Sequence, residues 1–146
     1  MIDIKHTSPF GLFRHQIAGL ALGTNKKHMA TAGGDHFDKT ASCLKTAHGF
    51  LQINDMNAVS GSFINLARIM EFNGDYDLAF EYYQNGIDTC KQTGNRQWEA
   101  FGYNGMAGTY QNVGKYDESI RLYEKCLEIF QELEFIKGVA GSYINI

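Results

Sequence analysis

Histidine, cysteine and acidic side chains are present in this sequence, but they are not spaced as a reactive site requires. The five histidines lie in the first third of the chain, with no pair at i, i+4 and no cysteine at zinc-finger spacing. We therefore expect no metal site. Cys43, Cys90 and Cys126 lie far apart and predict reduced thiols of a cytoplasmic protein. Because no nucleophile has a neighbouring base and no phosphate-binding loop is found, we expect neither catalysis nor a cofactor.

Two further patterns could suggest chemistry but have simpler structural interpretations. Gly102, Gly105 and Gly108 resemble a phosphate-binding loop only in their letters, because they neither follow a strand nor open a helix. They predict instead the close approach of two helices. An acidic series at i, i+4 spacing is most simply a solvated helix face, since no glycine-kinked loop presents its carboxylates to a metal. Its members are Glu124, Glu128 and Glu132.

Length, charge and hydropathy restrict the class of protein. The chain has 146 residues, which fits one compact domain. Thirteen basic and 16 acidic side chains leave a net charge of -3, which excludes the strongly basic character of a dedicated nucleic-acid binder. No uncharged apolar run approaches the 18 or more residues of a membrane span. We expect a protein with no membrane insertion and no nucleic-acid partner.

The strongest signal is an internal repeat. Residues 58–97 align with residues 98–137 at an offset of 40, and small and apolar residues match at helical spacing. The clearest matches are Phe63 with Tyr103, Ala67 with Ala107, Gly74 with Gly114, and Tyr83 with Tyr123. Each unit is predicted to contain a helix A and a helix B. The predicted helices span residues 58–73, 77–93, 97–113 and 117–133. Tyr83 and Tyr123 are predicted to occupy equivalent buried positions.

Glycine and acidic residues are expected to mark the turns between these helices. Gly74 and Gly114 lie where a helix must end in the left-handed conformation, and Gly94 closes the unit of residues 58–97 in the same way. Asp77 and Asp117 follow, and each is predicted to accept the unpaired N–H groups of the next helix.

The pattern continues toward both ends of the chain. Residues 37–53 predict another helix B, and residues 16–32 its helix A. The predicted units are therefore 14–57, 58–97, 98–137 and a partial 138–146, after a tail of residues 1–13. We expect either a fragment of a longer array or a last helix that a partner covers. As an alternative for residues 17–35, that segment resembles the inner hairpin of a WD-repeat blade.

These repeats resemble the tetratricopeptide repeat. The second unit supplies the pattern positions Phe63, Leu66-Ala67, Met70, Gly74, Ala79, Tyr83 and Gly86, and the third supplies Tyr103, Met106-Ala107, Tyr110, Gly114, Ser119, Tyr123 and Cys126. The resemblance implies an all-α, right-handed solenoid of antiparallel helix pairs, with about three repeats and a truncated fourth helix A. The 40-residue period and the absence of the closing proline resemble the long-helix variety found in kinesin light chains, rapsyn, Pins-type adaptors and bacterial peptide-sensing regulators.

The resemblance also implies a function, namely a scaffold that binds a peptide or helix of a partner protein in a concave groove lined by the A helices. Asparagine amides can donate to and accept from an extended backbone, and Arg68 could bind a carboxylate. The groove candidates carried over are Ile64, Asn65, Arg68, Glu71, Phe72, Phe101, Asn104, Gly108, Gln111, Asn112, Ile144 and Asn145. Alternatively, these are ordinary solvated helix residues. A different function class also remains open, a regulatory or ligand-sensing module of a longer signalling protein.

An apolar stripe is predicted near the C-terminus. Val139, Tyr143 and Ile146 fall at i, i+4 and i+7 of the partial fourth unit. A contiguous apolar stripe favours association, so we expect either a homodimer through this end or the docking of a partner helix.

Overall fold

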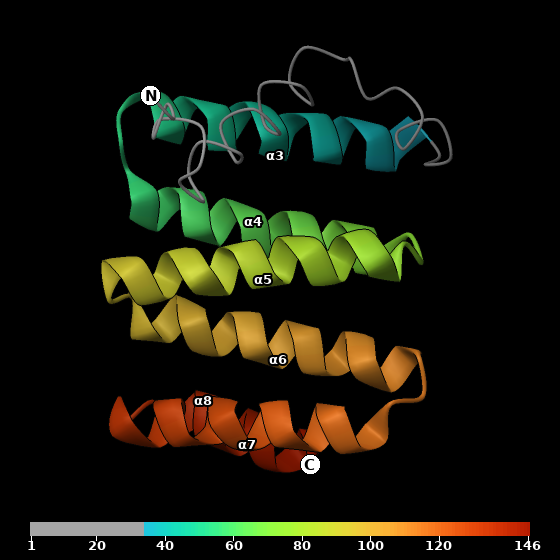
Figure 1. Ribbon diagram of the computed structural model, residues 1–146, viewed down its shortest axis with the longest axis vertical. Helices are drawn as coiled ribbons and strands as arrows, with labels where there is room; N and C mark the ends of the chain where they lie inside the picture. Colours follow the sequence, from blue (N-terminus) through green and yellow to red (C-terminus); the bar gives the residue numbers. More distant parts are fainter. Residues whose placement is uncertain (1–33) are drawn as a thin grey trace, which may run out of the picture.

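A computed structural model describes residues 34–146, and within that range the chain is a stack of α-helices with no strand (Figure 1). The helices are α3 (Gly34–Gln52), α4 (Met56–Phe72), α5 (Tyr76–Thr93), α6 (Arg96–Asn112), α7 (Tyr116–Glu132) and α8 (Ile136–Asn145). Each helix packs against the next, and α4 also contacts α6. This arrangement confirms the predicted all-α solenoid of helix pairs. The predicted tail and the helix at residues 16–32 fall outside the described residues, as does the WD-repeat alternative except for Gly34 and Asp35, which begin α3.

The turns recur at an interval of 20 residues. Left-handed backbone conformations occur at Asn54, Gly74, Gly94, Gly114 and Glu134, with φ between 52° and 79°. After each of them, the next N–H donates to the carbonyl oxygen five residues back at 2.9 Å, which is the Schellman closure of a helix. Each 40-residue repeat therefore consists of two segments of equal length, and each segment is one helix with the turn that follows it.

The N-caps lie two residues before the positions predicted for them. The side chains of Asp55, Asp75 and Asn95 each accept the backbone N–H of the third residue that follows. The prediction that Asp77 and Asp117 are caps is wrong, because both lie inside the first helical turns of α5 and α7. There their carboxylates still interact favourably with the positive end of the helix dipole.

The core lies between successive helices. Val59, Phe63 and Leu66 of α4 pack against Ala47 and Leu51 of α3. A second buried cluster joins α4, α5 and α6, and a third joins α6 and α7 with flanking contacts from α8.

The two repeat tyrosines, Tyr83 and Tyr123, are buried at equivalent positions, as predicted. The three cysteines are free thiols, of which Cys90 and Cys126 are fully buried.

Glycines on α6 allow α5 to approach closely, as the sequence predicted. A Cβ atom on Gly102 would lie 2.6 Å from Cγ1 of Ile87, and one on Gly105 would overlap the ring and hydroxyl of Tyr83. Ile87 and Tyr83 are one turn apart on α5, so two neighbouring side chains of α5 enter the space that two missing side chains of α6 leave. Tyr83 is fully buried for this reason.

The close approach yields a stability test with a matched control. We expect Gly105→Ala to lower the free energy of unfolding by about 1–3 kcal/mol, because the added methyl overpacks the contact with Tyr83. Gly141→Ala, in α8, meets no atom within 4 Å and should raise stability by about 0.5–1 kcal/mol through helix propensity. Urea denaturation of both variants measures the difference. Equal effects at the two sites would contradict the packing described for α5 and α6.

Candidate functional site

Four polar groove candidates of α4 and α6 lie at the surface. Asn65 and Arg68 of α4 are exposed, and so are Gln111 and Asn112 of α6. Phe72, at the end of α4, is 76% exposed. We call the surface formed by these five residues the A-helix face. Asparagine, glutamine and arginine side chains on one surface can donate to and accept from a peptide backbone or a carboxylate.

Most of the other candidates are partly or wholly used in packing. Ile64 is buried, and Asn104, Gly108 and Asn145 are half-buried. Phe101 is half-buried and packs edge-on against three other rings, with its centroid 5.6 Å from that of Trp98, 5.5 Å from that of Phe130 and 6.2 Å from that of Phe135. Ile144 is exposed.

The residues of the predicted C-terminal stripe have different environments. Val139 is half-buried and packs against the third core cluster, whereas Tyr143 and Ile146 are 61% and 50% exposed. The exposed part of the stripe therefore consists of Tyr143 on α8 and Ile146 directly after it rather than of all three residues.

The carboxylate of Glu71 joins the two helices of the A-helix face. Its Oε2 accepts a hydrogen bond from the hydroxyl of Tyr83 at 2.9 Å. Its Oε1 accepts from Nδ2 of Asn112 at 3.0 Å, a bond between α4 and α6. A Cβ atom on Gly108 would lie 3.4 Å from the same Oε1. Glu71 thus holds the C-terminal ends of α4 and α6 in a defined relation.

An equivalent hydrogen bond is formed by the corresponding tyrosine of the next unit, where the acceptor is uncharged. The hydroxyl of Tyr123 donates to Oε1 of Gln111 at 3.2 Å, and each tyrosine lies 12 residues after its acceptor. Burial, followed by the negative charge of Glu71 and the hydrogen bond to it, raises the pKa of Tyr83 far above its usual range. The structure therefore favours the protonated phenol, which alone can donate this bond.

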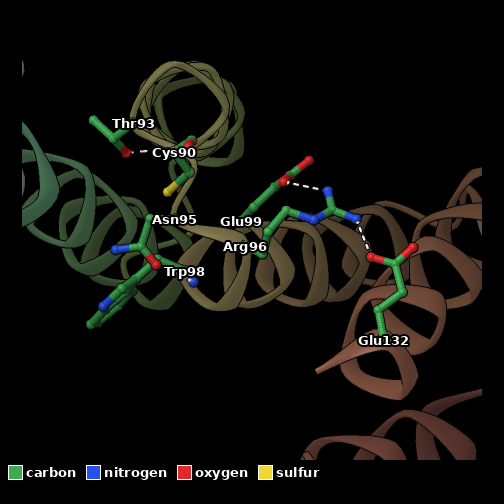
Figure 2. A network of polar contacts seen from close by, with 7 residues as sticks. All are labelled: Cys90, Thr93, Asn95, Arg96, Trp98, Glu99 and Glu132. Atoms are coloured by element: carbon green, nitrogen blue, oxygen red, sulfur yellow. Dashed lines mark hydrogen bonds and ion pairs between the residues drawn. The ribbon is translucent and has the colours of Figure 1, made fainter. Parts of the chain in front are cut away.

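An ion-pair network that the sequence analysis did not predict joins α6 to α7. Arg96 donates from Nη1 to Oε2 of Glu99 at 2.7 Å and from Nη2 to Oε2 of Glu132 at 2.6 Å (Figure 2). Glu99 is only 4% exposed, so Arg96 neutralises a buried charge. The hydrogen bonds that Arg96 donates to Glu132 and then to Glu99 raise the pKa of Arg96. Glu132, predicted as part of a solvated face, also serves as an ion-pair partner.

Trp98 points away from this network, as Figure 2 shows. Its ring lies against Gly61 of α4, where a Cβ would be 3.4 Å from it.

The i, i+3 spacing of Arg96 and Glu99 was a local signal of their pairing. The contact with Glu132 depends on the fold and had no such signal.

The paired tyrosines predict unequal losses of stability. Tyr83→Phe removes a hydrogen bond to a charged acceptor and should lower the free energy of unfolding by about 1.5–3 kcal/mol. Tyr123→Phe removes a bond to a neutral acceptor and should cost about 0.5–1.5 kcal/mol. Denaturant titration at neutral pH measures both, and a larger loss for Tyr123→Phe would contradict the role assigned to Glu71.

The raised pKa of Tyr83 makes the difference in stability between the wild type and Tyr83→Phe depend on pH. Its contribution to stability is complete below the unfolded-state pKa of about 10 and is lost as pH rises above it, because only the unfolded chain releases the proton readily. The wild type should therefore lose stability above about pH 10 more steeply than Tyr83→Phe.

Neither a metal site nor a membrane-spanning helix is found in the part of the chain that the structure describes. Residues 34–146 contain no group of three histidine, cysteine or acidic side chains that could hold a metal ion. Over the same residues, no helix is both long enough and apolar enough to cross a bilayer.

Comparison with known proteins identifies the repeats. A family model described as "Tetratricopeptide repeat" matches residues 59–132, just over half of the chain. "Protein CTR9 homolog" of Arabidopsis thaliana is 33% identical over 89 residues, which are 60% of this chain but only 8% of that protein. No solved structure gives a significant match. With the helix pairs, the glycine turns and the buried tyrosines described above, these findings show that the chain belongs to the tetratricopeptide repeat family.

Proposed function

We propose that the protein is a scaffold that binds a peptide or helix of a partner protein along the A-helix face. Tetratricopeptide repeats are in general protein–protein interaction modules. The observation that carries the proposal for this chain is the hydrogen bond from Asn112 to Glu71, which makes one continuous surface out of two successive A helices. A partner would therefore meet side chains from two repeats that are already held in place, and preorganisation lowers the entropic cost of binding.

The side chains of the A-helix face suggest how a partner is held. Asn65 and Gln111 offer amides for the backbone of an extended segment. The guanidinium of Arg68 can form two parallel hydrogen bonds to a carboxylate. Phe72 adds a large apolar surface at the edge of the same face. The remaining groove candidates, Asn104 and Asn145, together with the partly buried ring of Phe101, would extend this binding surface along α6 toward α8.

We further propose that the chain belongs with the long-helix repeats similar to those of kinesin light chains, rapsyn and Pins-type adaptors. The turns recur every 20 residues, whereas the usual 34-residue repeat gives about 17. A cytoplasmic location is part of the proposal, supported by three cysteines that are all free thiols. A scaffold that binds protein through surface side chains requires neither a cofactor nor catalytic residues.

Site-specific photo-crosslinking tests the location of the binding surface. A benzophenone side chain is introduced at Gln111 on the A-helix face and, as a control, at the exposed Glu124 on α7. We expect defined partner proteins, identified by mass spectrometry, to be captured from Gln111 and not from Glu124. Capture of the same proteins from both positions would contradict the proposal.

A pair of double variants tests which side chains hold the captured partner. Asn65→Ala with Arg68→Ala should reduce its recovery about tenfold, equivalent to about 1.4 kcal/mol. Glu124→Ala with Glu128→Ala changes two exposed residues of α7 and should leave recovery unchanged. Equal recovery with both double variants would show that the A-helix face is not the binding surface.

A further inference from the structure

Three lysines lie against tyrosine rings of the same helix. The Nζ atoms of Lys91 and Lys125 lie 5.7 and 5.6 Å from the ring centroid of Tyr103. The Nζ of Lys115 lies 6.0 Å from the centroid of Tyr110. Tyr103 and Tyr110 are seven residues apart, which is two turns, so both rings lie on one side of α6. Lys91 belongs to α5 and Lys125 to α7, and α6 lies between these two helices (Figure 1).

This side of α6 lies opposite Asn112, the residue through which α6 is bonded to Glu71. Tyr103 and Asn112 are nine residues apart, which is two and a half turns of α-helix, so they lie on opposite sides of α6. A ligand held by Lys91 and Lys125 would therefore contact a different side of α6 from the one that Asn112 occupies.

The preceding repeat shows that packing does not require charge at these positions. Forty residues earlier, Tyr103 corresponds to Phe63, Lys91 to Leu51 and Lys125 to Asn85. Phe63 is 1% exposed and packs with Leu51 in an apolar cluster. In the third unit the equivalent ring is half-buried, and both lysines beside it are exposed. The two ammonium groups are thus additions to this unit, and the helix packing common to both units is made without them.

Acidic side chains near the two lysines have other partners or form no ion pair with them. Asp88, one turn before Lys91, accepts a hydrogen bond from Gln84. Glu99 is paired with Arg96. Glu128 lies one turn after Lys125, but the ion pairs within residues 34–146 involve neither lysine. Neither lysine is in an ion pair within these residues, so two like charges converge on one aromatic ring, while the negative charges of Asp88 and Glu99 act on Lys91 without pairing with it.

We propose that Lys91, Lys125 and Tyr103 form a binding site for an acidic peptide segment of a partner protein. The two ammonium groups donate hydrogen bonds to its carboxylates, and the exposed part of the tyrosine ring packs against the peptide chain. A bound carboxylate reduces the repulsion between the two lysines, whereas a neutral or basic segment gains nothing from them. Lys115 extends the positive surface along α6.

Fluorescence anisotropy with the whole chain tests this site, using labelled hexaglutamate as the probe and labelled hexaglutamine as the neutral control. We expect hexaglutamate to bind and hexaglutamine not to bind. Lys91→Gln with Lys125→Gln should weaken hexaglutamate binding at least tenfold. Lys45→Gln with Lys137→Gln removes the same charge from exposed residues of α3 and α8 and should change affinity less than twofold.

Other outcomes of this experiment would overturn the proposal. Equal loss of affinity in both double variants would show a general charge effect and overturn it, as would the absence of hexaglutamate binding to the wild type. Circular dichroism confirms that the variants are folded. If Lys91→Gln with Lys125→Gln is unstable, Lys91→Arg with Lys125→Arg keeps both charges and should retain binding. Loss of binding in that folded arginine variant would contradict the site.

Discussion

The insertion of the Tyr83 side chain between two A helices is the contact on which the rest of this structure depends. Its ring fills the space left by Gly105 on α6, and its hydroxyl donates to Glu71 on α4. The same carboxylate then accepts from Asn112 on α6. One buried aromatic residue of a B helix therefore sets the distance between two successive A helices. The separation of the side chains on the A-helix face follows from that distance.

The two proposed binding surfaces use different side chains of α6 and depend on this packing in different ways. The A-helix face requires α4 and α6 to be held together, because its side chains come from both. The site at Tyr103 requires α5 and α7 to flank α6, so that Lys91 and Lys125 approach the same ring. A glycine-rich α6 satisfies both requirements, since it lets α5 pack closely. The cost is a weaker helix, about 0.5–1 kcal/mol for each interior glycine relative to alanine.

Features that repeat along the chain could be predicted from the sequence, and features of a single repeat could not. The offset of 40 predicted the helix pairs, the left-handed glycines and the equivalent burial of Tyr83 and Tyr123 because each is imposed on every unit. The N-caps were misplaced, because Asp75 and Asp77 are both good capping residues and only the backbone decides between them.

Contacts between residues distant in sequence carried no local signal. Arg96 and Glu132 are 36 residues apart, and Lys91 and Lys125 are brought together only by the stacking of α5 and α7 on α6. The groove candidates were carried over as one set, and the structure separates them by exposure. Asn65 and Arg68 are exposed, whereas Phe101 is packed against other rings.

A double-mutant cycle between Tyr83 and Gly105 tests the central contact most directly. Leucine at position 83 keeps an apolar side chain but lacks the outer ring atoms and hydroxyl that a Cβ on Gly105 would meet. In the wild-type background Gly105→Ala should be destabilising, and in the Tyr83→Leu background it should be neutral or stabilising. The coupling free energy should then be about 1–3 kcal/mol. An equal cost of Gly105→Ala in both backgrounds would show that Tyr83 does not set the spacing of the A helices.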